Sequence, residues 1–258
     1  MLPPLEAWCL RLALMLATVL ALPATALAAE VSVAVAANFA APMKRIAQAF
    51  ERDTGHRATL AFGGTGQFHA QIRHGAPFGL LLAADSETPR KLEAEGQAVG
   101  GTRFTYAIGQ LVLWSAKPGA VDSQGQALRA GAFERIAIAN PKLAPYGAAA
   151  MEVLDRMGLR ERLAPRIVEG ANIGQAYQFV ASGNAALGFV ALSQVHEAGR
   201  LREGSAWIVP AALHAPIRQD AVLLKAGRDN PAAAALMAYL RGDQARAIIR
   251  AHGYALAP

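Results

Sequence analysis

The chain has 258 residues, of which 53% are hydrophobic and 17% are charged, and its formal net charge is +6 at pH 7. This length can bury the core of one large domain or of two small ones. The 25 Lys and Arg residues are spread along the chain without a block of like charge or a basic stripe interleaved with aromatic residues, which argues against a nucleic-acid-binding protein.

The first residues have the pattern of a secretory signal peptide. An apolar run from Leu12 to Leu22 is followed by Pro23 and then by Ala26, Leu27 and Ala28, which fits the small-x-small rule for signal peptidase. The run is too short to span a bilayer. We therefore predict a cleaved signal peptide over residues 1–28 and a periplasmic protein, with a retained N-terminal anchor as the alternative.

The only cysteine, Cys9, lies inside this predicted signal peptide. For the mature chain we therefore expect no disulfide, no thiolate metal site and no cysteine nucleophile. Cys9 also precedes the apolar run instead of closing it, a position that argues against a lipoprotein anchor.

Strand-like and helix-like segments alternate through the rest of the chain. The predicted strands, in chain order, are 31–37, 57–62, 78–85, 105–116, 135–140, 166–170, 186–192, 206–211 and 220–227. The helical period is clearest in 39–54, where Phe39, Met43, Ile46 and Phe50 recur at spacings of four, three and four. Strands separated by helices are typical of βαβ units and parallel sheets.

Two long extended segments suggest two lobes. The stretch 105–116 is unusually long for one strand, and 217–225 is a second long extended stretch far downstream. Such strands can carry the chain from a first lobe to a second and back. We therefore expect an α/β fold in which lobe 1 comprises 30–110 plus 218–258 and lobe 2 comprises 111–217.

Known catalytic motifs are missing from the sequence. It has no GxxxxGK[ST] phosphate loop, no HExxH, no GxSxG and no GxGxxG after the first strand. The six histidines include no pair at metal-ligand spacing on a helix, and Asp85 and Glu87 are interpreted as a helix start. We therefore expect a binding protein without a cofactor or a metal, not an enzyme.

Four segments share a character that indicates a ligand site. Each follows a predicted strand, opens a predicted helix and is nearly free of charge; they are AANFAAP (36–42), FGGTGQF (62–68), NPKLAPYGAA (140–149) and GANIGQA (170–176). Ligands of open parallel α/β sheets bind at this edge, where helix starts offer unpaired N–H groups and partial positive charge. Several such starts converging on one point would bind an anion with neutral donors alone. Taken singly, each segment is also explained as a helix cap or a turn.

Four longer stretches carry a family resemblance: VAANFAAPMKRIAQAFERDTG, FGGTGQFHAQIRHGAPFGLLLAAD, IANPKLAPYGAAA and EGANIGQAYQFVASGNAALGFVAL. Together and in this order they resemble the periplasmic molybdate-binding proteins of ABC importers. The resemblance implies a two-lobed, hinged fold of the type II periplasmic-binding class, in which each lobe is a mostly parallel sheet flanked by helices and two crossing strands join the lobes. It also implies molybdate or tungstate as the ligand, a membrane permease as the partner and a monomeric protein.

Carried over by motif, the resemblance implies five ligand contacts. Asn38 and the backbone around Ala37 donate hydrogen bonds from the first loop, and Thr65 donates through its hydroxyl and its backbone N–H. The N–H groups of Tyr146 and Ile173 complete the cage from across the cleft.

Three positions depart from the pattern of the family. Ala37 stands where relatives can carry a hydroxyl residue, and Thr65 replaces the more usual serine. Ala191 lies where another branch has a tyrosine that contacts the anion. These departures leave the class of ligand unchanged and bear on affinity and selectivity.

Three alternatives remain open: a receptor for another oxyanion such as sulfate or phosphate, an exported enzyme on the same fold, and a sensor that reports ligand to a membrane protein. Neutral donors suit a fully deprotonated anion, whereas a phosphate that keeps a proton requires an acceptor, and Glu169 is the carboxylate near these loops. The enzyme would need a nucleophile–base pair and the sensor a signalling segment, and we expect neither.

Overall fold

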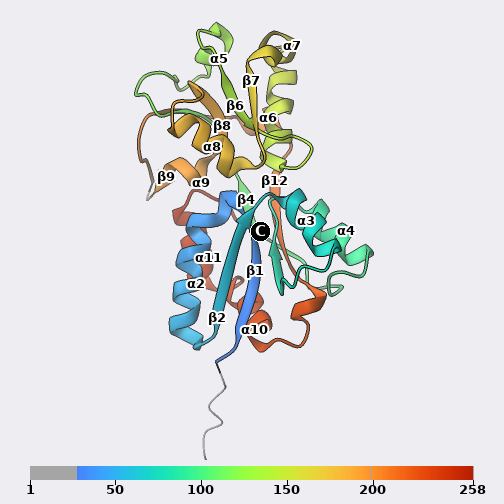
Figure 1. Cartoon of the computed structure of the whole chain (residues 1–258). Coiled ribbons are helices and arrows are strands. Elements are labelled where there is room, and N and C mark those ends of the chain that lie inside the picture. The colour runs from blue at the N-terminus through green and yellow to red at the C-terminus, as the bar shows by residue number, and fades with distance from the viewer. Residues whose placement is uncertain (1–27, 198, 258) are drawn as a thin grey trace, which may run out of the picture.

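The computed structural model describes residues 28–197 and 199–257, so the predicted signal peptide over 1–28 lies outside the described residues except for its last one. Two five-stranded sheets, each flanked by helices, form two lobes stacked end to end (Figure 1). This confirms the predicted two-lobed α/β fold. Among the described helices, none has the length and apolar character needed to cross a membrane.

Lobe 1, the lower lobe in Figure 1, is built on a sheet with the strand order β2-β1-β3-β12-β4. Its strands are β1 (Glu30–Ala36), β2 (Arg57–Gly63), β3 (Leu80–Leu82), β4 (Phe104–Gly109) and β12 (Ile217–Leu223). One face packs against α2 (Ala40–Thr54), α10 (Pro231–Tyr239) and α11 (Asp243–Ala251), and the other against α3 (Thr65–Arg73) and α4 (Glu87–Ala94). Because strand side chains alternate between faces, Val33 and Val35 lie in the first core and Ala34 in the second.

The predicted apolar face of the first helix is confirmed. Phe39, Met43, Ile46 and Phe50 are all 0% exposed, and full burial of each such side chain contributes about 1.5–3 kcal/mol. The α-helix begins at Ala40, because a 3-10 turn over Ala37–Phe39 precedes it. The turn therefore leaves Ala37 and Asn38 at the end of β1, ahead of the helix.

Lobe 2 is built on a second sheet with the order β11-β5-β8-β6-β7. Its strands are β5 (Leu111–Ser115), β6 (Ile136–Ala139), β7 (Ile167–Gly170), β8 (Leu187–Ala191) and β11 (Ser205–Ile208). One face packs against α5 (Gln126–Ala130), α6 (Pro145–Arg156) and α7 (Arg160–Leu163), and the other against α8 (Ile173–Ala181) and α9 (Leu192–Val195). The remaining short elements are the hairpin of β9 (His196–Glu197) and β10 (Arg200–Leu201) and the 3-10 turns η2 (Ala164–Arg166), η3 (Ala211–Leu213) and η4 (Lys225–Gly227).

Each sheet has one strand that runs against the other four. In lobe 1, β12 pairs antiparallel with β3 and β4, and in lobe 2, β5 pairs antiparallel with β8 and β11. The other neighbouring strands pair parallel. The two reversed strands are those by which the chain arrives from the opposite lobe. A strand that enters a sheet at the edge where the others end must run opposite to them.

The predicted strand 105–116 is two strands, and this prediction of a single element was wrong. The chain leaves the sheet of lobe 1 at Gly109 and joins the sheet of lobe 2 at Leu111, so Gln110 lies at the crossing. The return crossing runs through 209–216 into β12. The expected lobe boundaries differ from this sheet membership only at Ile217, which belongs to β12, and they remain a prediction.

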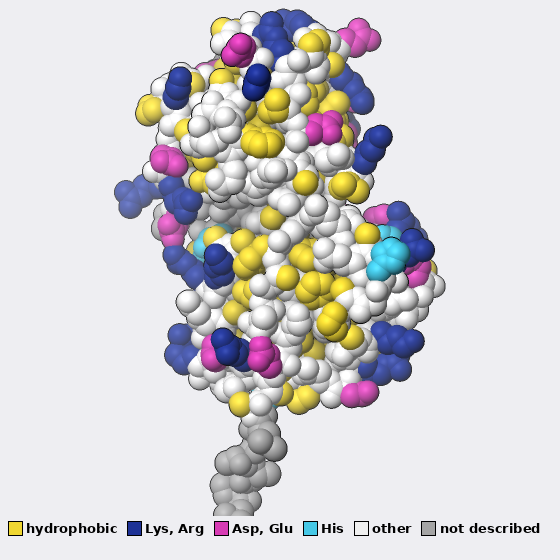
Figure 2. Space-filling model, in the orientation of Figure 1, with side chains coloured by type: hydrophobic (Ala, Val, Ile, Leu, Met, Phe, Trp, Pro, Cys, Tyr) yellow, Lys and Arg dark blue, Asp and Glu magenta, His cyan; other side chains and the backbone are white. Residues whose placement is uncertain are grey.

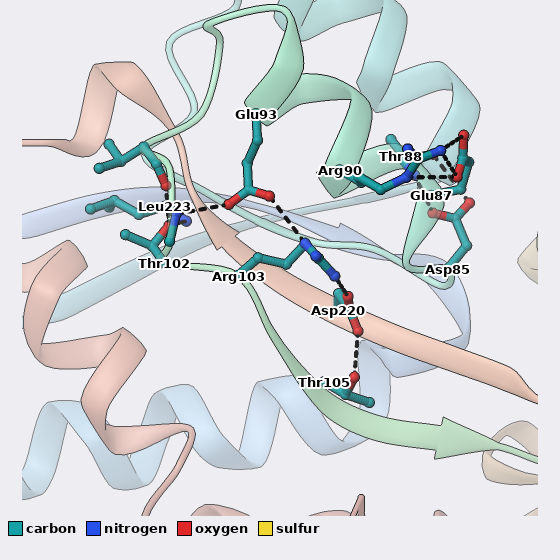
Figure 3. Close-up of polar contacts among 12 residues, drawn as sticks. Asp85, Glu87, Thr88, Arg90, Glu93, Thr102, Arg103, Thr105, Asp220 and Leu223 are labelled. Atoms are coloured by element: carbon teal, nitrogen blue, oxygen red, sulfur yellow. Dashed lines mark hydrogen bonds and ion pairs between the residues drawn. The ribbon is translucent and has the colours of Figure 1, made fainter.

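A buried acidic residue anchors the returning strand β12. Asp220 is 1% exposed, and its carboxylate accepts hydrogen bonds from Arg103 Nη1 at 2.7 Å and from Thr105 Oγ1 at 2.7 Å (Figure 3). Arg103 Nε also donates to Glu93 on α4 at 3.1 Å. These two carboxylates raise the pKa of Arg103, so the ion pair ties β12 to β4 and α4.

The β4–β12 ladder shifts its register beside this anchor. Gln219 pairs with Ala107 and Asp220 pairs with Thr105, so Tyr106 is an extra residue on β4. Such a bulge bends the strand and redirects side chains. It lies where β12 leaves the boundary between the lobes.

The predicted helix start at Asp85 is confirmed. Asp85 accepts hydrogen bonds from the N–H of Thr88 at 2.8 Å and from its hydroxyl at 3.1 Å, and Glu87 pairs with Arg90 on the outer surface of α4 (Figure 3). Burial raises the pKa of Asp85. Its bonds to Thr88 cap α4.

We predict that Asp220→Ala lowers the free energy of unfolding by about 2–4 kcal/mol, because it removes two charge-assisted hydrogen bonds and leaves Arg103 short of a partner. Asp155→Ala is the matched control, since Asp155 pairs with Arg160 at 2.8 Å but both side chains are about half exposed; that loss should stay below about 1 kcal/mol. Urea unfolding of both variants measures the difference. Equal losses would contradict the anchoring role of Asp220.

Candidate functional site

The four predicted loop segments meet between the two lobes. The 3-10 turn after β1 and the start of α3 after β2 come from lobe 1, and the starts of α6 and α8, after β6 and β7, come from lobe 2. All four follow the carboxyl ends of strands. The reversed crossing strands turn these two edges toward each other, which brings the loops together.

These segments line a small cavity. Its volume, counted as the space open to the centre of a water molecule, is about 10 Å³, which is room for roughly one water-sized sphere. Its lining residues are Ala36, Ala37, Asn38, Gly63, Gly64, Thr65, Ala84, Ala144, Pro145, Tyr146, Asn172 and Ile173. None of these lining residues is charged, so a ligand here must be compact and is contacted by neutral groups.

The surface agrees with this uncharged centre. In Figure 2 the middle of the waist between the lobes shows backbone, neutral polar and hydrophobic atoms, and the Lys, Arg, Asp and Glu side chains lie at its edges. One larger hollow, of about 370 Å³, borders the cavity and shares Ala84, Ala144 and Pro145 with it, and another, of about 590 Å³, lies apart in lobe 2. Both are lined by residues of both charges. Neither of them contains Asn38, Thr65, Tyr146 or Ile173.

The structure brings all five predicted contact residues to the one small cavity. Asn38, Thr65, Tyr146 and Ile173 are 1%, 2%, 1% and 4% exposed, and Ala37 is half-buried. Their convergence from four separate segments was expected from the sequence. Their role as ligand contacts stays a prediction.

At the start of α3, most backbone donors already have acceptors. The N–H of Gly64 donates to the side chain of Gln67 at 2.9 Å, and the N–H of Gly66 donates to the carbonyl of Leu143 at 3.1 Å. The N–H of Thr65, between them, has no acceptor among the described residues. Because Thr65 lines the cavity, its N–H is a donor of this turn that remains for a ligand.

The helix starts of lobe 2 repeat this arrangement. At α8, Asn172 Oδ1 accepts from the N–H groups of Gly174 at 2.9 Å and Gln175 at 3.1 Å. At α6, the first residue is Pro145, which has no N–H. The N–H groups of Tyr146 and Ile173 bond to no acceptor in the part of the chain that the structure describes. The Asn172 cap satisfies the neighbouring N–H groups of α8, and Pro145 has no N–H to satisfy in α6. One N–H donor at the cavity is therefore left in the first turn of each of these two helices.

The Thr65 hydroxyl is oriented by a backbone group. Its Oγ1 accepts a hydrogen bond from the N–H of Ala84 at 2.9 Å, so one lone pair is used and the hydroxyl proton remains free to donate. Thr65 can therefore offer two donors at the cavity, its hydroxyl and its N–H. The sequence predicted both.

The side-chain donor predicted for Asn38 is used elsewhere. Asn38 Nδ2 donates to Gln219 Oε1 at 2.9 Å and to the Tyr254 hydroxyl at 2.9 Å, and its Oδ1 has no hydrogen-bond partner among the described residues. An amide has two N–H donors, and both are engaged in a buried network. In this arrangement the side chain of Asn38 offers no N–H to the cavity. The residue contributes its backbone and the volume of its side chain.

This network joins the cavity to the crossing strands. Gln219 on β12 is 0% exposed; it accepts from Asn38 and from Tyr106, the latter at 3.0 Å, and donates to the Tyr146 hydroxyl at 3.0 Å. Burial raises the pKa of Tyr106, Tyr146 and Tyr254 above the ordinary value. All three therefore stay protonated at neutral pH, and the network carries no formal charge.

A second set of contacts joins the lobes at the backbone of Asn38. The Ser193 hydroxyl, from α9 in lobe 2, donates to the Asn38 carbonyl at 2.8 Å, and the Tyr254 hydroxyl lies 2.9 Å from Ser193 Oγ. Arg45 on α2 pairs with Glu197 on β9 nearby. The first loop is thus held from both lobes.

Two residues named from the sequence lie apart from the cavity. Ala191 ends β8, is 0% exposed and does not line the cavity, so the position offers no side-chain donor. Glu169 is exposed on β7 and also lies outside the lining. In the described part of the chain, His, Cys, Asp and Glu form no cluster of three or more suited to a metal ion.

The supporting residues Gln219, Tyr254, Ser193 and Tyr106 were missed by sequence reasoning. They come from four distant segments, and only the fold brings them together. One signal was available: the polar pair Gln219-Asp220 stands directly before the apolar run 221–224, inside the long extended stretch 217–225. Buried polar groups of this kind require partners.

Comparison with known proteins agrees with this geometry. Residues 31–255 match the family described as "Bacterial extracellular solute-binding protein". The chain is 61% identical to the molybdate-binding protein ModA of Azotobacter vinelandii over 91% of its own length and 93% of the relative's, and 52% identical to ModA of Rhodobacter capsulatus over 93% of each. The solved structure of the periplasmic molybdate-binding protein of Azotobacter vinelandii superposes with a TM-score of 0.86 at 44% identity, covering 88% of this chain and all of that one.

We predict that Gln219→Leu lowers the free energy of unfolding by roughly 3 kcal/mol, because three hydrogen bonds are lost and buried groups of Asn38 and Tyr146 are left without partners. Gln71→Leu, on the exposed surface of α3, is the control and should change the stability by less than about 0.5 kcal/mol. Urea unfolding monitored by circular dichroism measures both. A Gln219 variant as stable as the Gln71 variant would show that the network does not hold the site.

Proposed function

This chain belongs to the family of bacterial extracellular solute-binding proteins, and from that membership we propose that it captures molybdate or tungstate between its two lobes and delivers it to the permease of an ABC importer. The relatives at 61% and 52% identity are both named as molybdate-binding proteins. Both align over more than nine-tenths of this chain.

One observation carries the proposal most directly. A small cavity with no charged residue among its described lining is faced by three helix starts. The N–H groups of Thr65, Tyr146 and Ile173 and the Thr65 hydroxyl are donors that no described acceptor uses. Helix starts with free N–H groups bind anions, so the proposed ligand contacts are Ala37, Asn38, Thr65, Tyr146 and Ile173, with Asn38 acting through its backbone.

The donor set favours a fully deprotonated oxyanion. Hydrogen bonds to a charged acceptor contribute about 1.5–3 kcal/mol each, so four or more convergent ones support tight binding without a counter-charge. A phosphate oxygen that keeps its proton needs an acceptor, and Glu169 is exposed and outside the cavity lining. Molybdate and tungstate carry no such proton at neutral pH. Discrimination against sulfate then depends on the size of the cavity.

Binding is coupled to the approach of the lobes. We take 30–110 plus 218–258 and 111–217 as the two units; Gln110 lies between the two sheets, and β12 begins at Ile217, within one residue of the second boundary. Thr65 belongs to the first unit, and Tyr146 and Ile173 to the second. An anion that bonds to both units favours the closed arrangement, since only there do all donors reach it.

The wider role follows from the same family membership. We propose a periplasmic protein that acts as a monomer, carries the anion without a cofactor and catalyses no reaction. Its ligand is its cargo, and the permease is its macromolecular partner.

Isothermal titration of the mature protein with molybdate, tungstate, sulfate and phosphate tests the ligand. We expect saturable binding of molybdate and tungstate at one site per chain and much weaker or no binding of sulfate and phosphate. Binding of sulfate without binding of molybdate would refute the specific proposal. Binding of none of the four anions would refute the receptor role.

We predict that Thr65→Val weakens molybdate affinity by about tenfold or more, because it removes a donor to a charged acceptor worth about 1.5–3 kcal/mol. The substitution keeps the volume of the side chain and also deprives the Ala84 N–H of its acceptor. Thr65→Ser keeps the hydroxyl and should bind within about threefold of the unsubstituted protein. Titration calorimetry measures the molybdate affinity of the two variants and of the unsubstituted protein. Equal affinities of the Thr65→Val variant and the unsubstituted protein would exclude the hydroxyl from binding.

A further inference from the structure

A backbone hydrogen bond joins the two lobes next to the cavity. The N–H of Gly66, in the first turn of α3 in lobe 1, donates to the carbonyl of Leu143 at 3.1 Å. Leu143 lies in lobe 2, on the loop between β6 and α6. First-turn N–H groups have no acceptor within their own helix, so this donor is available to the opposite lobe.

Position 66 leaves little room for a side chain, so a Cβ there would displace its neighbour slightly. A Cβ at Gly66 would lie 3.0 Å from the Leu143 carbonyl oxygen, 3.1 Å from its Cα and 3.2 Å from its Cδ2. Among the residues that the structure describes, Leu143 is one of three large hydrophobic side chains that stay exposed, at 41%, and it lies over the bare backbone of α3. The pair therefore combines a hydrogen bond with an apolar contact at the lip of the cleft.

The acceptor is presented by a turn that is held from within its own lobe. Asn140 accepts hydrogen bonds at its carbonyl oxygen from the N–H groups of Leu143 at 3.1 Å and Ala144 at 2.9 Å, and at Oδ1 from Lys142 at 2.9 Å. The N–H of Asn140 itself donates to Gly170 at 2.7 Å. The position of the Leu143 carbonyl thus does not depend on lobe 1.

The lobes approach each other closely at two further glycines around the cavity. A Cβ at Gly64 would lie 3.3 Å from Asn172 Cβ, and a Cβ at Gly174 would lie 3.3 Å from Ala37 Cβ. Each contact pairs a residue of one lobe with a residue of the other. The three glycines lie within one residue of Thr65 or Ile173, so the spacing of the lobes at these points also sets the spacing of the proposed donors.

We propose that the hydrogen bond from Gly66 to Leu143 is a latch that holds the lobes closed and sets how long a bound anion stays. This inference rests on the proposed function. Neither Gly66 nor Leu143 lines the cavity, so both are positioning residues. An enclosed ligand leaves when the lobes part, and a contact made only between closed lobes slows that step. Its loss therefore changes the dissociation rate more than the association rate.

Gly66→Ala tests the latch, because the added Cβ pushes the Leu143 carbonyl away while leaving the cavity residues unchanged. Leu143→Ala removes the apolar part of the contact and keeps the carbonyl. Gly100→Ala is the matched control, since a Cβ at that exposed position in lobe 1 meets no atom within 4 Å. Release of labelled molybdate into an excess of unlabelled molybdate gives the dissociation rate, and calorimetry gives the melting temperature of each ligand-free protein.

We expect Gly66→Ala to release molybdate about threefold to tenfold faster, as loss of one hydrogen bond implies, and Leu143→Ala to release it faster by a smaller factor. Gly100→Ala should match the unsubstituted protein, and the melting temperature without ligand should not change for any of them. Release by Gly66→Ala at the unsubstituted rate would overturn the latch. So would a fall in its ligand-free melting temperature, because Gly66 would then act within a lobe. If the unsubstituted protein bound no molybdate, the proposed function would fail instead.

Discussion

The whole arrangement depends on the direction in which two strands cross between the lobes. Because β5 and β12 each enter a sheet at the edge where the parallel strands end, the carboxyl edges of both sheets must face each other. Helix starts follow those edges, and their first-turn N–H groups cannot be satisfied within the helix. Strand polarity alone therefore directs unpaired donors from both lobes toward one point.

That point is polar without being charged, and the surrounding residues keep it so. Caps such as Asn172 and Gln67 satisfy the neighbouring N–H groups, so the free donors are few and fixed in direction. Behind the cavity, tyrosines kept protonated by burial meet Gln219 and Asn38. A buried network in which nearly every group has a partner is rigid, and rigid neutral dipoles can hold an anion without the desolvation cost of a buried cation.

The sequence predicted the fold class and the four loops well, because both leave local signals. Alternation of apolar runs with a period-3.6 face predicted β1 and α2, and uncharged glycine- and asparagine-containing turns predicted the site segments. It failed where long-range pairing decides the outcome. One predicted strand proved to be two, since Gln110 is an ordinary residue whose position between two sheets leaves no mark. The two side-chain N–H donors of Asn38 bond to Gln219 and Tyr254, which are remote in sequence, and no local pattern predicts such partners.

The sequence by itself determined most of the segments that form helices and strands, and that the turns before α3, α6 and α8 are nearly free of charge, with Lys142 as the exception, because these depend on neighbours along the chain. Only the tertiary structure decided that these turns close one cavity, that Gln219 links it to the crossing strand, and that Gly66 meets Leu143. The reason is geometric. A hydrogen bond between remote segments forms only where the donor–acceptor distance is right to within a few tenths of an ångström. Strand polarity and packing set that distance, and neither can be read from the neighbours of a residue along the chain.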